Sequence, residues 1–216
     1  MNFIFYALVI TIFLAYGNPT KEIQISHSKA TPIVPTINYS LDTNRIIEKA
    51  KEALAYNKTK NLNTNYCILI DMQIHSGRNR LFLWDFKQNK IVLSCLSSHG
   101  CGNEPWGQDN TKETPLFSNT SDSHLSSIGK FKIGKRGWSN WGIHVNYKLH
   151  GLEKTNSNAY KRIIVLHSWE AVQENETYPN GTPEGWGCPA VNNEKMKVLD
   201  AYLKKEKTPV LLWIFE

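Results

Sequence analysis

The stretch VLHSWEAVQENETYPNGTPEGWGCPAVNN, residues 165–193, contains the features that decide how the C-terminal part of this chain folds. It begins with a strand-like apolar run that ends on His167. A polar loop rich in glycine and proline follows and ends on Cys188, with Gly187 before it and Pro189 after it. These residue types leave four roles open for the cysteine: disulfide partner, metal ligand, packing thiol or nucleophile.

The setting of Cys188 suits a nucleophile. Gly185 and Gly187 let backbone N–H groups turn toward a ligand, and acyl transfer needs such donors for the oxyanion. His167 lies at the tip of the apolar run, where it is available as a general base. The dipole of the helix expected after the loop favours the thiolate slightly. From the residues alone, a structural or disulfide-bonded cysteine remains an equal alternative to a catalytic one.

The other cysteines are Cys67, Cys95 and Cys101. In an exported protein, four cysteines allow two disulfides. Cys67 and Cys95, however, lie inside apolar, strand-like runs, where cysteine often acts as a small hydrophobic residue. No CxxC pair occurs and the histidines are scattered, so the sequence predicts no zinc site and no other metal.

The N-terminal residues 1–17 are expected to be a signal peptide. Their apolar core ends near Ala15-Tyr16-Gly17, a small-x-small cleavage pattern. The positively charged start typical of such segments is missing, so an uncleaved anchor remains the alternative. Both readings predict export to the periplasm or cell envelope. Polar, proline-bearing residues 18–40 indicate a linker, and residues 41–216 a single domain.

Two helical patterns accompany a series of strand patterns. The helices are expected in residues 41–58, with Asp42 or Thr43 as N-cap, and in residues 192–207, with Asn192 or Asn193 as N-cap. Six runs rich in β-branched and aromatic residues predict strands in residues 66–74, 80–98, 129–135, 141–152, 161–168 and 209–215, with a hairpin turn at residues 87–89. The sequence therefore predicts a mainly β, largely antiparallel domain with a helix at each end.

Charge is spread evenly along the chain. Lys and Arg exceed Asp and Glu by 25 to 19, a net charge of +6, with no concentrated block. This pattern favours a solvated basic surface, and a weak attraction to an anionic envelope polymer is the alternative. No arginine-rich or aromatic-interleaved stripe indicates nucleic-acid binding.

Five ordered motifs resemble those of the L,D-transpeptidases of bacterial cell walls, and more narrowly the murein L,D-transpeptidase catalytic domain family. They are SSHGCGN (97–103), FSNTSDSHLSSIGKFKIG (117–134), HGLEKTNSNAYKR (150–162), RIIVLHSWEAV (162–172) and GWGCPAV (185–191). The resemblance covers the chain from about residue 66 to its C-terminus. It implies a mixed β-sandwich or barrel with a peripheral helix at each end.

The resemblance also implies roles for individual residues. Cys188 becomes the nucleophile, His167 its base, and the backbone amides of Gly187 and Cys188 the oxyanion hole. A second partner for the cysteine, ranked below His167, is His99. The residues expected on the substrate side are His99, Gly100, Ser118, Asn119, Ser126, Ser127, Trp169, Gly185 and Trp186.

Three positions depart from the broader family. Gly185 stands where a serine or threonine is usual, and Trp186 where the commonest pattern has histidine. The lost hydroxyl puts rate and substrate positioning in question. Cys101 is also unusual: it is either a partly exposed bystander or, if it lies near Cys188, a partner in a reversible disulfide.

The implied chemistry needs no cofactor. Cys188 attacks the carbonyl of the third residue of a stem tetrapeptide, D-alanine leaves, and an amine resolves the thioester into a 3→3 cross-link. Water instead of the amine gives an L,D-carboxypeptidase. The imidazole is expected to lower the thiol pKa from about 8.5 and so supply thiolate at neutral pH.

The expected partners are peptidoglycan stem peptides, and the protein is expected to be a monomer. Two other classes remain open. One is another murein cysteine hydrolase, and the other is a non-catalytic peptidoglycan-binding module.

Overall fold

Eight strands and two helices make up the part of the chain that the structure, a computed structural model, describes: residues 42–216. The helices are α1 (Thr43–Lys60) and α2 (Asn193–Leu203). The strands are β1 (Tyr66–Asp71), β2 (Leu81–Asp85), β3 (Lys90–Cys95), β4 (Gly129–Trp138), β5 (Val145–Gly151), β6 (Val165–Ser168), β7 (Ala190–Val191) and β8 (Leu211–Phe215).

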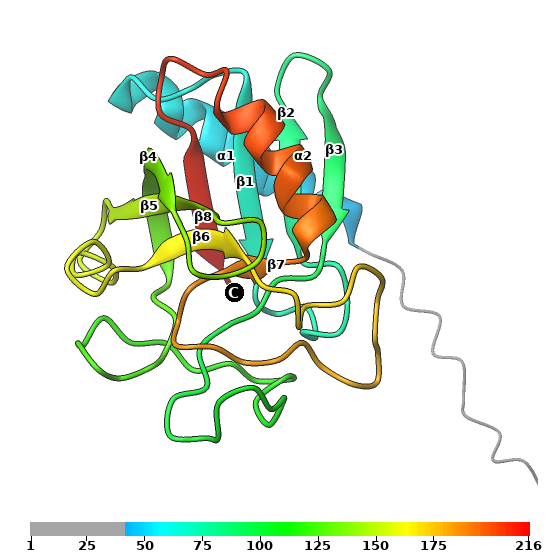
Figure 1. Cartoon of the computed structure of the whole chain (residues 1–216). Coiled ribbons are helices and arrows are strands. Elements are labelled where there is room, and N and C mark those ends of the chain that lie inside the picture. The colour runs from blue at the N-terminus through cyan, green and yellow to red at the C-terminus, as the bar shows by residue number, and fades with distance from the viewer. Residues whose placement is uncertain (1–41) are drawn as a thin grey trace, which may run out of the picture. The chain divides into compact units, whose positions relative to one another are not determined.

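All eight strands belong to one sheet, in the order β3-β2-β1-β8-β4-β5-β6-β7. β1 pairs with β8, and β6 with β7, in parallel, whereas the other five neighbouring pairs are antiparallel. The last strand, β8, therefore lies in the middle of the sheet between β1 and β4 (Figure 1).

The central strands are buried on both faces. Side chains alternate along a strand, so Cys67 and Leu69 of β1 join one core cluster while Ile68 and Ile70 join another. β2 and β8 alternate between the same two clusters. A sheet covered on both faces explains why these strands read as nearly continuous apolar runs.

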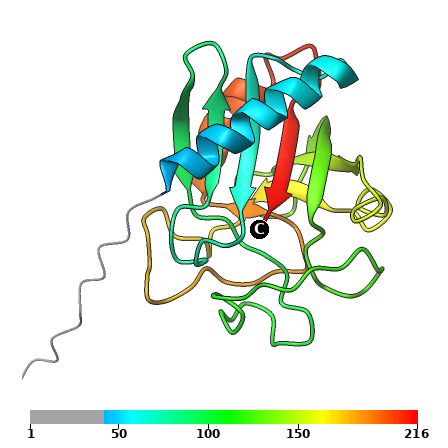
Figure 2. The ribbon, with the colours of Figure 1, turned by 180° about the vertical axis from the view of Figure 1, so that it is seen from behind.

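Helix α1 covers one face of the sheet (Figure 2). The predicted N-cap is confirmed at Asp42, whose side chain accepts hydrogen bonds from the backbone N–H groups of Asn44 and Arg45. The helix buries the apolar positions Ile46, Ala50 and Ala53 against the sheet.

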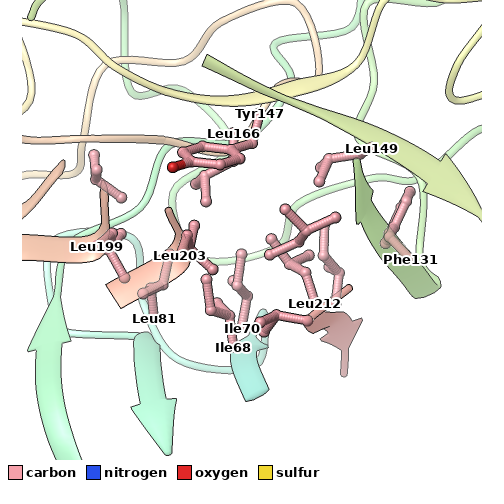
Figure 3. Packing of buried hydrophobic residues seen from close by; sticks show 14 of the residues in the cluster. Ile68, Ile70, Leu81, Phe131, Tyr147, Leu149, Leu166, Leu199, Leu203 and Leu212 are labelled. Atoms are coloured by element: carbon pink, nitrogen blue, oxygen red, sulfur yellow. The ribbon is translucent and has the colours of Figure 1, made fainter. Parts of the chain in front are cut away.

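Helix α2 packs on the opposite face, in front of the sheet in Figure 1. Leu199 and Leu203 share one core with Ile70 of β1, and Leu166 of β6 lies across that core (Figure 3). The sheet therefore curls until β5 and β6 lie opposite β1 and β2. The mainly β, barrel-like fold with a helix near each end is confirmed. Helix α2 is not peripheral throughout, because its apolar side chains belong to the core.

Some local predictions need adjustment. The hairpin between β2 and β3 is confirmed, with Asn89 in the left-handed conformation that its turn requires. The strand expected from residue 161 begins only at Val165, because Ile163 has a φ of 59° and interrupts the extended backbone. The two-residue strand β7 is too short to leave a sequence pattern.

The predicted leader and linker, residues 1–17 and 18–40, lie outside the described residues. Within residues 42–216, no helix is long and apolar enough to cross a membrane.

Candidate active site

Strand β6 and the segment leading into β7 hold the histidine and the cysteine in one place. In the parallel pairing His167 lies beside Ala190, and its N–H donates to the Pro189 carbonyl oxygen at 3.4 Å. The N–H of Val165 donates to Cys188 Sγ, also at 3.4 Å. Cys188 is therefore fastened to β6, and its side chain and that of His167 line the same cavity.

His167 is held in the tautomer that a general base needs. Its Nδ1 lies 2.9 Å from the Ser168 carbonyl oxygen, and because a carbonyl only accepts, Nδ1 carries the proton. Nε2 of the neutral ring is then free to accept one. Burial lowers the pKa of His167 below its usual value, against smaller opposing effects of the Ser168 carbonyl and Glu170. At neutral pH the ring is accordingly uncharged.

Cys188 does not have the lowered pKa that the sequence analysis expects. Burial is the largest effect and raises the pKa of the thiol, while the Val165 N–H and the charge of Arg162 lower it in part. The resting pair is therefore a neutral thiol and a neutral imidazole. In such a pair the thiolate forms by proton transfer during attack.

Arg162 supports the cysteine loop from outside the cavity. Its guanidinium donates hydrogen bonds to four oxygens: the carbonyls of Ser118 and Leu125 and the hydroxyls of Ser123 and Ser127. Gly187 packs against this cluster with a φ of 96°, and a Cβ there would lie 2.5 Å from the Leu125 carbonyl oxygen. Only glycine fits at Gly187 without strain.

The peptide around Cys188 is fixed by its carbonyl groups. Ser126 Oγ donates to the Gly187 carbonyl oxygen, and Ser98 Oγ to that of Cys188, each at 3.2 Å. Within residues 42–216, the backbone N–H groups of Gly187 and Cys188 have no hydrogen-bond partner. Two available donors on a fixed peptide are what an oxyanion hole requires.

The cavity around the cysteine has a volume of about 340 Å³ and aromatic walls. Its lining residues are Ser98, Trp106, Trp141, His167, Trp169, Gly185, Trp186, Cys188 and Ala190. Trp106 stacks on Trp169 with ring centroids 4.9 Å apart, and Trp141 meets Trp169 edge-on at 6.1 Å. Trp106 and Trp141 remain 46% and 43% exposed, so much of the indole surface is accessible to a ligand.

Three of the expected substrate-side residues line this cavity: Trp169, Gly185 and Trp186. Five others lie outside its lining and form hydrogen bonds that support the surrounding loops: Gly100, Ser118, Asn119, Ser126 and Ser127.

His99 is fully buried and does not line the cavity. Arg80 Nη2 lies 2.8 Å from His99 Nδ1, and because a guanidinium only donates, Nδ1 accepts and Nε2 donates to Thr111 Oγ1. Burial and the charge of Arg80 lower the pKa of His99 to about 2. His99 therefore fastens one loop, and its carbonyl oxygen accepts from the Gly185 N–H at 2.8 Å.

All four cysteines are free thiols, so the described residues contain no disulfide. Cys67 and Cys95 are buried in the core clusters, which confirms their interpretation as small hydrophobic residues. Cys101 is buried instead of partly exposed, and its N–H donates to the Gly185 carbonyl oxygen.

Sequence reasoning missed Arg162, Trp106 and Trp141 as members of the site. A signal for the tryptophans was present: Trp106, Trp141 and Trp186 are each followed directly by a glycine. All three of these glycines have positive φ, so the chain turns sharply after each indole.

Comparisons with known proteins give a family match for this chain. The sequence profile of the L,D-transpeptidase catalytic domain matches residues 38–213. No curated protein matches the chain.

Solved structures give distant matches. The L,D-transpeptidase from Xylanimonas cellulosilytica DSM 15894 is 12% identical, with a TM-score of 0.38 over 70% of this chain and 60% of that one. The Ldtfm-avibactam carbamoyl enzyme is 12% identical, with a TM-score of 0.40 over 70% and 49%. The helical cell shape determining protein Pgp2 from Campylobacter jejuni is 10% identical, with a TM-score of 0.44 over 70% and 47%. This chain thus spans less than two thirds of each of these chains.

Proposed function

Because this chain belongs to the L,D-transpeptidase catalytic domain family, we propose that it transfers acyl groups of peptidoglycan stem peptides through a thioester on Cys188. His167 is the general base and acid. The backbone N–H groups of Gly187 and Cys188 form the oxyanion hole. The acyl donor is the third residue of a stem tetrapeptide, and the product is a 3→3 cross-link.

One observation carries this proposal: a thiol and an unprotonated imidazole nitrogen share one cavity, beside two backbone N–H groups without partners. A nucleophile, a base and oxyanion donors are the three components that acyl transfer requires. A cysteine kept only for packing needs neither the base nor the donors.

The acylation step follows from the neutral resting pair. His167 Nε2 takes the thiol proton as the sulfur attacks the carbonyl carbon, and the developing oxyanion accepts hydrogen bonds from Gly187 and Cys188. The tetrahedral intermediate then expels D-alanine, whose amine takes the proton from His167. A thioester remains on Cys188.

The second step reverses these roles. An amine of a neighbouring stem attacks the thioester, His167 accepts a proton from it, and the sulfur leaves and recovers that proton. Attack by water gives a tripeptide, which is the L,D-carboxypeptidase alternative.

The substrate and its location complete the proposal. Trp169, Gly185 and Trp186 contact the stem peptide, since they line the cavity beside the nucleophile. Peptidoglycan lies outside the cytoplasm, so the enzyme works in the cell envelope after export. It acts as a monomer, and its basic surface contributes only a weak contact with the envelope.

Product analysis tests this function. The full chain is incubated with sacculi rich in tetrapeptide stems, and the muropeptides are identified by mass spectrometry. We expect 3→3 dimers and free D-alanine from the native chain, and neither from Cys188→Ala or His167→Ala variants that remain folded. Tripeptides without dimers would indicate the hydrolase, and absence of both products would leave a binding module.

Covalent labelling gives an independent check on the nucleophile. A carbapenem should add its own mass to the intact protein, and Cys188→Ala should abolish the adduct. An adduct that persists in this variant would contradict the assignment of Cys188.

A further inference from the structure

Four indole rings near Cys188 have no part in the acyl-transfer steps themselves. We call Trp106, Trp141, Trp169 and Trp186 the tryptophan wall; all four line the cavity. Trp169 is buried, whereas Trp106, Trp141 and Trp186 are 46%, 43% and 62% exposed. Large aromatic side chains gathered and left open beside a nucleophile mark a ligand surface.

A sharp backbone turn follows each exposed tryptophan of the wall. Each of the three exposed rings precedes a left-handed glycine, with φ values of 80° at Gly107, 57° at Gly142 and 96° at Gly187. These turns come from three separate loops, yet they bring the rings to one cavity. Glycine adopts such turns at the lowest conformational cost, so the turn after each exposed ring agrees with the residue that follows it.

The charges around the tryptophan wall favour a cation. The chain has a net charge of +6, but no lysine or arginine lines the cavity. Two charges act from just outside the lining: that of Glu170, whose Oε2 accepts from the Gly142 N–H at 3.1 Å next to Trp141, acts on His167, and that of Arg162 acts on Cys188. An anionic group would find no cation among the lining residues, whereas a cation finds the indole faces of the tryptophan wall.

Hydrogen-bonding capacity argues against a sugar ring as the ligand. Ser98 Oγ already donates to the Cys188 carbonyl oxygen and accepts from the Ala190 N–H. The other side-chain hydrogen-bonding groups of the lining are those of the catalytic pair and the indole N–H groups. The hydroxyls of a buried pyranose would mostly remain unpaired, which is costly.

We propose that the tryptophan wall binds the alkylammonium group of the acyl acceptor through cation–π contacts, so that an amine and not water resolves the thioester. This inference rests on the proposed function and specifies the acceptor for the same site. Indole faces attract an ammonium ion without accepting its proton, and an acceptor bound there displaces water from beside the thioester.

The chemistry balances without any co-reactant. The bound ammonium first loses one proton to solvent. The amine nitrogen then forms a bond to the thioester carbon, and His167 accepts a second proton from that nitrogen. The carbon–sulfur bond breaks, and the sulfur takes the proton from His167, which regenerates the thiol and leaves an amide.

A binding experiment tests the cation directly. The full chain with Cys188→Ala is titrated with choline and with its neutral isostere 3,3-dimethylbutan-1-ol, and tryptophan fluorescence is followed. We expect saturable binding of choline and weaker binding of the alcohol. Equal affinities, tighter binding of the alcohol or no choline binding would overturn the proposal.

Variants locate the binding surface. In the Cys188→Ala background, Trp141→Leu should weaken choline binding by about fivefold or more, since one cation–π contact is lost, and Trp141→Phe should retain most of it. The matched control is Trp138→Leu, because Trp138 is 71% exposed, stacks on His144 and lies outside the cavity lining. An equal effect of Trp138→Leu would overturn the proposal.

A partition experiment connects binding to chemistry. With tetrapeptide as donor and an Nα-blocked lysine as acceptor, the ratio of amide product to tripeptide is measured. In an otherwise native chain, Trp141→Leu should lower this ratio about fivefold or more while D-alanine is still released, and Trp138→Leu should leave it unchanged. An unchanged ratio in Trp141→Leu would overturn the inference.

The two proposals fail differently. If no D-alanine is released and no carbapenem adduct forms, the acyl-transfer function fails, whether or not choline binds. If D-alanine is released but Trp141→Leu leaves the ratio of amide product to tripeptide unchanged, only the inference about the tryptophan wall fails.

Discussion

In the proposed reaction, the neutral state of Cys188 and His167 determines how the first step begins. Burial opposes charge on both side chains, because it raises the pKa of the thiol and lowers the pKa of the imidazole. A thiolate–imidazolium pair is thus disfavoured before substrate arrives. The proposed mechanism therefore requires the oxyanion donors and the proton transfer to His167 to act together.

The activity should therefore persist into mildly acidic solution. The base form of His167 is needed, and burial lowers its pKa from 6.5, so this form survives below that pH. We expect kcat/KM for D-alanine release to fall on acidification with a midpoint below 6.5. A pH–rate profile on a soluble tetrapeptide gives this midpoint, and a value at or above 6.5 would show that His167 is not held neutral by burial.

Arg162 lowers the pKa of Cys188, whereas burial raises it. Its positive charge lowers the pKa of Cys188, so Arg162→Met should raise that pKa further and slow alkylation of the thiol at neutral pH by roughly three- to tenfold. Arg162→Lys keeps the charge and should recover part of the rate. The iodoacetamide rate measured against pH separates a pKa change from simple loss of structure, since misfolding would expose the sulfur and accelerate labelling.

In the loop that ends on Cys188, Gly185 and Gly187 are separated by one residue and differ in how strictly the backbone requires glycine. Gly187 has a φ of 96°, and a Cβ there would lie 2.5 Å from the Leu125 carbonyl oxygen. Gly185 has no positive φ, and a Cβ there would meet no atom within 4 Å. Backbone geometry therefore requires glycine at Gly187 and permits a side chain at Gly185.

Matched substitutions in this loop should have opposite outcomes. Gly187→Ala should cost about 1–3 kcal/mol of unfolding free energy and abolish the carbapenem adduct, because the oxyanion peptide must shift. Gly185→Ala should change stability by less than about 0.5 kcal/mol and keep the adduct. Denaturant unfolding and intact-mass kinetics measure both effects. Equal destabilisation by the two variants would contradict this account.

The elements that could be predicted from the sequence are those fixed by local periodicity and turn chemistry. The helix capped by Asp42 and the hairpin that turns at Asn89 are of this kind. β7 could not be predicted because a two-residue pairing leaves no sequence pattern, and the late start of β6 could not because a β-branched residue such as Ile163 favours extended backbone but here has a φ of 59°. The same holds for the cavity. Trp106 and Trp141 come from distant loops, and only the curled sheet brings them beside Cys188.

At the scale of the whole molecule, a buried cluster couples folding to pH. His99 accepts a hydrogen bond from Arg80 and donates to Thr111, and its Nε2 lies 3.6 Å from the carboxylate of Glu184. Glu184 is itself fully buried, and burial raises its pKa. The cluster joins the loop after β3 to the loop that ends on Cys188, so protonation of His99 would disturb the support of the site.

Acid should therefore destabilise the fold well before the carboxylates titrate. The pKa of His99 is about 2 in the folded chain and about 6.5 when unfolded, so between these values the unfolded state binds more protons. The free energy of unfolding should be highest above pH 6.5 and fall as pH drops through this window, by up to about 1.4 kcal/mol per pH unit. Glutamine at this position offers the same acceptor and donor without a titrating ring, so His99→Gln should remain folded and flatten the slope. Denaturant unfolding at neutral and mildly acidic pH measures both slopes, and identical slopes in the two proteins would mean that His99 does not carry this acid sensitivity.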